Sequence, residues 1–220
     1  MKKRVGLCFI LVFIAVIAAI FFPLDIISIL KDRLLGVGNN YSSLKIYSLG
    51  GDIKVYIDGE EKGIAKEKGS YLEVLPIDVG EHEVKLVREA TEEGFYPDFE
   101  RIINCEKGFD TVISWEIGPT EEASSGWILY AQNASYKNGH TLINLTCKPR
   151  DCKINIDEKG EHTAPITKLN LSLNEQHTFK ASKEGYQDLE VQVLPEDEEA
   201  RASLEGYELF FEVNLYRIPI

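Results

Sequence analysis

The 220-residue sequence is poor in basic residues and in cysteine. It has 24 Lys+Arg against 36 Asp+Glu, which gives a formal net charge of −12. A protein that binds nucleic acid needs a cationic face, so this balance excludes nucleic acid as an expected partner. Four cysteines are too few for a small scaffold built on disulfides. The hydrophobic content of 44% is too high for general disorder and predicts a packed core.

Sequence motifs of catalysis are also missing. The chain has no Gly-x-Ser-x-Gly elbow, no His-Glu-x-x-His metal motif and no Gly-x-x-x-x-Gly-Lys phosphate loop. Its carboxylates fall in clusters such as residues 196–199, which predict a solvated acidic surface; the alternative is weak binding of a divalent cation there. We therefore expect no enzyme activity, no cofactor and no metal site.

The N-terminus holds one long hydrophobic run. Residues 5–22 carry no charge and would span ~27 Å as a helix, close to the ~30 Å hydrocarbon core of a bilayer. Three basic residues at positions 2–4 precede the run and favour a cytoplasmic N-terminus, with the rest of the chain outside. We therefore predict a single-pass helix in the cell membrane. A cleaved signal peptide is the alternative, although the run lacks an Ala-x-Ala site.

From residue 43 onwards the hydrophobic period is two. Ile53, Val55 and Ile57 share one side of a predicted strand, and residues 209–215 repeat the pattern near the C-terminus. Such alternation is typical of half-buried strands. Turn residues such as Asp58-Gly59 separate the strands. The sequence predicts an all-β fold of small β-sandwiches.

The strand pattern occurs twice. Three positions recur with offsets of 99, 95 and 91 residues, namely Asp58 with Asp157, His82 with His177, and Gly94 with Gly185. Differences in loop length explain the drift in these offsets. Because a histidine stands at the same place in both copies, its expected role is structural, at the start of a strand, rather than catalytic.

The order of these motifs resembles the PEGA domain family, the small all-β modules of prokaryotic surface proteins. The motifs that carry the resemblance are Asp58-Gly59, Gly80-Glu81-His82 and Gly94-Phe95 in the first copy, and Asp157, His177 and Gly185-Tyr186 in the second. The resemblance implies surface-exposed β-sandwiches linked to envelope or carbohydrate-associated architectures. It implies no catalytic site.

These features together predict two PEGA-like β-sandwich modules preceded by one transmembrane helix. The expected division is a cytoplasmic tip, membrane helix and hinge (1–40), a first module (41–119), a connector with one strand (120–140) and a second module (141–220). The strand over residues 127–132 fits either module.

Cys147 and Cys152 flank a four-residue turn, and alternation points both side chains to the apolar face. Directly opposed strand residues lie within disulfide range, and such a bond is compatible with a location outside the cytoplasm. The alternative is two buried free thiols that act as small apolar residues. No second Cys or His pair accompanies them, so a metal site is not expected.

Exposed aromatic side chains are the candidate ligand-stacking residues, namely Tyr47, Tyr56, Trp127, Tyr130 and Tyr136. Flat aromatic surfaces stack on sugar rings or anchor protein contacts. Cross-strand pairing of the tyrosines, or contact between the two modules, is the structural alternative.

The function predicted from these features is non-catalytic. We expect a membrane-anchored attachment or scaffolding protein on the outer side of a prokaryotic cell membrane, with an envelope protein or polysaccharide as its partner. A carbohydrate-binding surface module and the ectodomain of a sensory complex are the alternatives.

Overall fold

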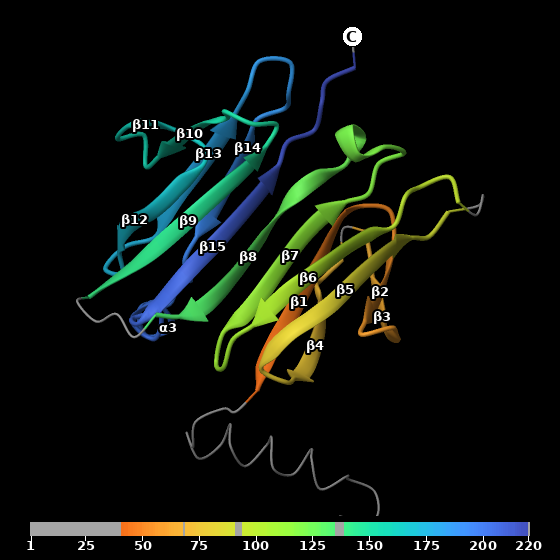
Figure 1. Ribbon diagram of the computed structural model, residues 1–220, viewed down its shortest axis with the longest axis horizontal. Coiled ribbons are helices and arrows are strands. Elements are labelled where there is room, and N and C mark those ends of the chain that lie inside the picture. The colour runs from red at the N-terminus through yellow and green to blue at the C-terminus, as the bar shows by residue number, and fades with distance from the viewer. Residues whose placement is uncertain (1–40, 68, 91–93, 135–138, 220) are drawn as a thin grey trace, which may run out of the picture. The chain divides into compact units, whose positions relative to one another are not determined.

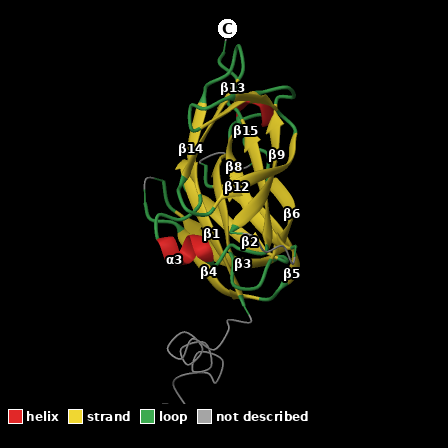
Figure 2. Ribbon diagram, turned by 90° about the vertical axis from the view of Figure 1, so that its left-hand side faces the viewer, coloured by secondary structure: helices red, strands yellow, loops and turns green. Residues whose placement is uncertain are grey.

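Nearly all the regular structure is β-strand (Figures 1 and 2). The computed structural model describes residues 41–67, 69–90, 94–134 and 139–219. Within these residues the helices are the 3-10 helix η1 (Glu121–Ala123) and the five-residue helix α3 (Glu198–Ala202). The all-β, sandwich-like prediction is confirmed, because alternating residues such as Ile53, Val55 and Ile57 are buried as expected.

The strands form three sheets. The largest, here called the shared sheet, has the order β12 (Ile166–Ser172), β9 (His140–Lys148), β15 (Tyr207–Asn214), β8 (Ser125–Asn133), β7 (Asp110–Glu116), β1 (Ser42–Gly50), β4 (Leu72–Ile77). The first small sheet has the order β3 (Glu60–Ala65), β2 (Ile53–Ile57), β5 (Gly80–Arg88), β6 (Phe99–Cys105). The second small sheet has the order β11 (Glu161–Thr163), β10 (Lys153–Ile156), β13 (His177–Ser182), β14 (Leu189–Val193).

The two small sheets cover opposite faces of the shared sheet. Ile128 of β8 belongs to the core under the first small sheet, whereas its neighbour Leu129 packs against the core under the second. Successive side chains of a strand point to opposite faces. Each small sheet therefore covers one half of the shared sheet, and the two lie on opposite faces. No other sheet among the described residues covers the remaining half of either face.

The two halves of the fold repeat each other around β8. β1 pairs with β7 in parallel, as β9 does with β15, and β8 lies antiparallel to both β7 and β15. Going outward from β8, the strands β7, β1 and β4 on one side thus correspond to β15, β9 and β12 on the other, and corresponding strands run in the same direction. A pseudo-twofold axis along β8 produces this arrangement, and it also places the small sheets on opposite faces.

The predicted fold class needs a correction. Two separate sandwiches were expected, but β8 pairs with both halves and joins them in one sheet. The fold class also included a transmembrane helix, and no helix among the described residues is long and apolar enough to cross a bilayer. The run predicted to span, residues 5–22, lies outside those residues. The corrected class is an all-β fold with two cores on one shared sheet.

Candidate functional site

A groove of about 530 Å³ runs over the shared sheet beside the first small sheet. Its walls come from segments far apart in the sequence, namely residues 97–101 at the start of β6, the ends of β7, β9 and β15, the η1–β8 region and the turn after β9. A volume of this size is typical of ligand pockets.

The groove follows from the offset of the two small sheets. β6 is the last strand of the first small sheet, and its Asn104 side chain donates a hydrogen bond of 3.2 Å to the Ala131 carbonyl of β8. Beyond that contact the shared sheet continues into β15 and β9 without a covering sheet on this side. The start of β6 therefore forms a wall of the groove beside the open part of the shared sheet, which is its floor.

The apolar part of the groove centres on an aromatic pair. The rings of Phe99 and Trp115 lie 4.6 Å apart with an interplanar angle of 46°, and both side chains are half-buried. Ile117 and Ile128 lie beside them, in the first core. This surface can hold an apolar side chain or a ring of a ligand.

The charged side chains around the groove are mostly paired with one another. Arg101 of β6 forms an ion pair with Glu212 of β15, which ties the wall to the floor. Lys148 and Glu121 pair at 2.7 Å. The groove's other carboxylates, Asp98 and Glu100, both bind Lys85, at 2.6 and 3.0 Å respectively.

Arg150 differs from these paired charges. It is exposed in the turn after β9, and among the described residues lining the groove it is the charged side chain without an ion pair. The turn that carries it is closed by a disulfide between Cys147 and Cys152, whose Cα atoms are 6.2 Å apart. Closing a loop this short stabilises the fold by about 2 kcal/mol in the chain-entropy model. The disulfide also limits the positions that Arg150 can take.

The aromatic residues singled out from the sequence do not come together. Tyr47 pairs with Tyr71 at 5.2 Å on the open face of β1, and Tyr56 lies within 3.4 Å of Glu61 on the first small sheet. Trp127 packs 5.9 Å from Phe211 against the second core. Tyr136 lies outside the described residues.

Tyr130 occupies the face of the shared sheet that continues the groove floor. Its ring stacks on Phe210 at 5.1 Å with an interplanar angle of 10°, and its hydroxyl donates to Glu212 at 3.2 Å. Burial, together with the neighbouring Glu212 charge, raises the pKa of Tyr130 to about 12.

The repeated histidines hold the same turn in both halves. Nδ1 of His82 lies 2.6 Å from Asp58, and Nδ1 of His177 lies 2.7 Å from Asp157. Each Nε2 lies 2.9 Å from a backbone carbonyl. Each aspartate also accepts the backbone N–H of the residue after its histidine, at 2.9 and 2.8 Å. Both aspartates have a positive φ of 52°, so each histidine fixes a left-handed turn. This arrangement is called the His–Asp lock below.

Hydrogen bonds shift the pKa values of both aspartates and of His82. The hydrogen bond from His82 holds the pKa of Asp58 below its ordinary value. Burial alone would lower the pKa of His82, but its bonds to Asp58 and to the Asp78 carbonyl outweigh burial, and that pKa is raised. In the second lock, burial alone would raise the pKa of Asp157, yet the bonds from His177 and the Thr178 N–H lower it.

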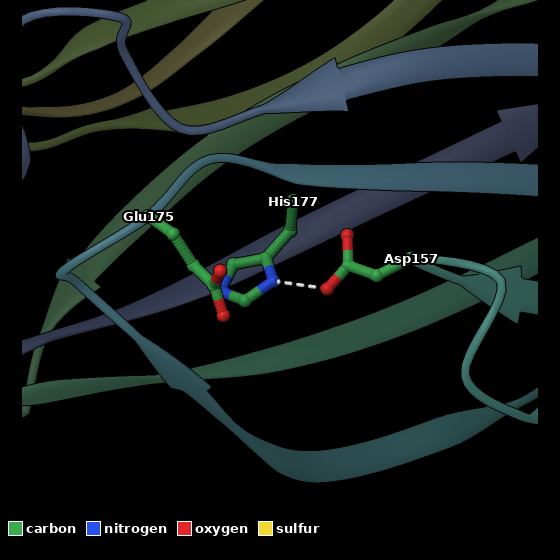
Figure 3. A group of neighbouring side chains, drawn as sticks. All are labelled: Asp157, Glu175 and His177. Carbon is green, nitrogen blue, oxygen red and sulfur yellow. Dashed lines mark hydrogen bonds and ion pairs between the residues drawn. The ribbon is translucent and has the colours of Figure 1, made fainter.

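The second lock includes a group of residue types that bind metals. Asp157, Glu175 and His177 have potential ligand atoms within 4.8 Å of one another (Figure 3). However, Nε2 of His177 faces the Ser172 carbonyl, which can only accept a hydrogen bond, and Nδ1 faces Asp157. A metal would have to displace one of these bonds. The first lock has the same bonds without a second carboxylate. The geometry supports a structural role for this group.

The acidic run at residues 196–199 is part of a helix cap. Asp197 accepts the Ala200 N–H at 2.8 Å and so caps α3. The buried Arg201 side chain donates to three backbone carbonyls, those of Leu173, Pro195 and Glu196. These contacts account for the acidic run structurally.

Sequence reasoning did not find the groove. Phe99, Trp115, Arg101 and Arg150 come from three different segments, and none of them belongs to a motif. Trp115 lies on the same side of its predicted strand as Ile113 and Ile117, so its position in the sequence indicated only burial. The groove depends on which strand stands at the edge of the first small sheet, and no local pattern reports that.

Comparisons with known proteins give little further information. No family model matches the chain, and no curated protein matches it. One solved structure that it resembles is the Bacillus anthracis TIE protein, at 15% identity and a TM-score of 0.24. The match covers 81% of this chain but 34% of the other, so the chain spans about a third of the length of that structure. A likeness at this level carries no argument about function.

Proposed function

We propose that this protein is a non-catalytic binding module that attaches, outside the cytoplasm, to a component of a prokaryotic cell envelope. The groove between β6 and the open half of the shared sheet carries the proposal. It combines an aromatic pair with polar groups around it, which is the composition of a recognition site.

The chemistry of the groove favours binding over turnover. Its Cys147 is held in a disulfide, and its Ser124 hydroxyl donates to the Thr120 carbonyl at 2.9 Å. The carboxylates are engaged with basic side chains, as described above. The Cys147 and Ser124 side chains and the ion-paired carboxylates are thus engaged in structural contacts, which supports a binding role.

Two observations support a location outside the cytoplasm. The disulfide between Cys147 and Cys152 is of a kind that persists in oxidising compartments. The resemblance of the motif order to PEGA domains, which are surface modules, agrees with this location and stays part of the proposal.

The proposal is tested by filling the groove. Thr146 is exposed and lines the groove, so Thr146→Trp places a bulky ring in it. Thr163→Trp, at an exposed threonine of β11, is the matched control. The full-length proteins are sedimented with envelopes from the cells that produce them. We expect the wild type and Thr163→Trp to pellet with the envelopes and Thr146→Trp to remain in the supernatant. Equal pelleting of all three proteins would contradict the proposal.

A further inference from the structure

We propose that the groove takes an extended peptide segment of a partner protein, which adds as a strand to the free edge of β6 and places a carboxylate at Arg150. The inference rests on the proposed function, because it names the ligand class of the same groove.

The first argument is the edge of β6. In the first small sheet β6 pairs with β5 on one side, and no strand of the described residues pairs with it on the other. Residues 97–101 at this edge line the groove. The edge of a sheet presents unpaired backbone N–H and C=O groups, which an extended peptide satisfies by pairing. A sugar has no regular row of donors and acceptors to match them.

The second argument is the open floor beside that edge. Neighbouring strands lie ~4.8 Å apart and packed sheets ~10 Å apart. A strand added to β6 would therefore continue the first small sheet over the uncovered part of the shared sheet. Tyr130 packs at the border of the first core, and the half-buried Phe210 of β15, stacked on it, lies on that part. Alternate side chains of the added strand would pack against it, as core residues do under the rest of the small sheet.

The third argument is the charge of the groove. Arg150 is left without an ion pair where the other charged lining residues are paired, and a guanidinium binds a carboxylate through two parallel hydrogen bonds. The chain as a whole carries a charge of −12, which repels a polyanion at long range. A peptide with a single acidic side chain or a C-terminal carboxylate can bind Arg150 without being repelled as a polyanion. An acidic polysaccharide can also bind Arg150, but the net charge of the chain repels it.

The inference is tested with short random peptides displayed on phage and panned on the full-length protein, beside an array of neutral and acidic oligosaccharides. Enriched peptides are synthesised and titrated against the wild type, Arg150→Glu and Lys107→Glu. Lys107 is exposed beyond the other end of β6 and outside the groove, so it controls for the change in net charge. Amide hydrogen exchange is then measured with and without peptide.

We expect enriched peptides to carry a carboxylate and to bind Arg150→Glu at least about tenfold more weakly than the wild type. Lys107→Glu should bind like the wild type, and exchange should slow at residues 99–101. Peptides that bind Arg150→Glu equally well, or that protect other strands, would overturn the inference. Binding of oligosaccharides alone, blocked by Thr146→Trp, would overturn the peptide class and leave the proposed function intact. Envelopes that bind neither Thr146→Trp nor the wild type would overturn the proposed function itself.

Discussion

At the scale of single residues, the two His–Asp locks show the same contacts in different surroundings. The His82 side chain is 15% exposed and that of Asp58 is 55% exposed, whereas the corresponding values are 7% and 18% for His177 and Asp157. An ion pair in contact with water contributes little, and breaking a buried pair costs several-fold more. The second lock should therefore stabilise the fold more than the first.

The locks are tested by replacing each aspartate with asparagine, which tolerates a positive φ and can still accept the backbone N–H. At pH 5 we expect Asp58→Asn to lower the free energy of unfolding by about 1 kcal/mol and Asp157→Asn by about 3 kcal/mol. Urea denaturation measures both. Glu184→Gln, at an exposed carboxylate away from both turns, is the control and should change stability by less than about 0.5 kcal/mol. If Asp58→Asn and Asp157→Asn lower the free energy of unfolding no more than Glu184→Gln does, the locks do not stabilise the fold.

The effect of Asp58→Asn should depend on pH. The lowered pKa of Asp58 stabilises the fold above the ordinary value of 3.8, and this contribution is lost as the pH falls through the lowered value. The raised pKa of His82 stabilises the fold below 6.5, and this contribution is lost as the pH rises through the raised value. The difference between wild type and variant should thus be largest between pH 3.8 and 6.5.

At the scale of secondary structure, β8 decides how the two halves are joined. The sequence predicted a strand here but could not assign it to one module. The reason is physical, because apolar side chains stand on both of its faces, with Ile128 in the first core and Leu129 against the second. A period-two pattern shows which strands are half-buried, as it did for β2. It does not show that one strand contributes side chains to two cores. That depends on which strands, far apart in the sequence, pair with β8.

The start of β8 depends on Gly126. Its φ is +147°, and a Cβ there would lie 2.1 Å from the backbone oxygen of Ser114 on the neighbouring strand β7. We expect Gly126→Ala to lower the free energy of unfolding by about 3 kcal/mol, because both the backbone conformation and the close approach are lost. Thermal and urea denaturation measure the change. Gly160→Ala is the control, since a Cβ there meets open space. Comparable losses at the two sites would show that the close approach is not needed.

At the scale of the whole described unit, residues 41–220 are compact and share one sheet. The two cores are separate, but β7, β8 and β15 are backbone-paired across them. Loss of either core would leave half of the shared sheet without cover. The two halves should therefore unfold together, unlike two modules on a flexible connector.

The two tryptophans allow a direct test, because Trp115 packs against the first core and Trp127 against the second. Leu86 is fully buried in the first core, and Leu86→Ala should lower stability by about 3 kcal/mol. In single-tryptophan variants carrying Trp115→Phe or Trp127→Phe, fluorescence should report one urea transition, shifted by Leu86→Ala to the same extent in both. A shift seen only through Trp115 would mean that the halves unfold independently.

The direction of the strands has a mechanical consequence. β1 and β15 run parallel, because β7 is parallel to β1 and β8 is antiparallel to both β7 and β15. A pull applied to the start of β1 and the end of β15 therefore acts along the strands. The hydrogen bonds of three adjacent strand pairs are then loaded in shear, all at once, rather than opened one after another like a zipper. Such a geometry resists unfolding when tension is applied at these two ends.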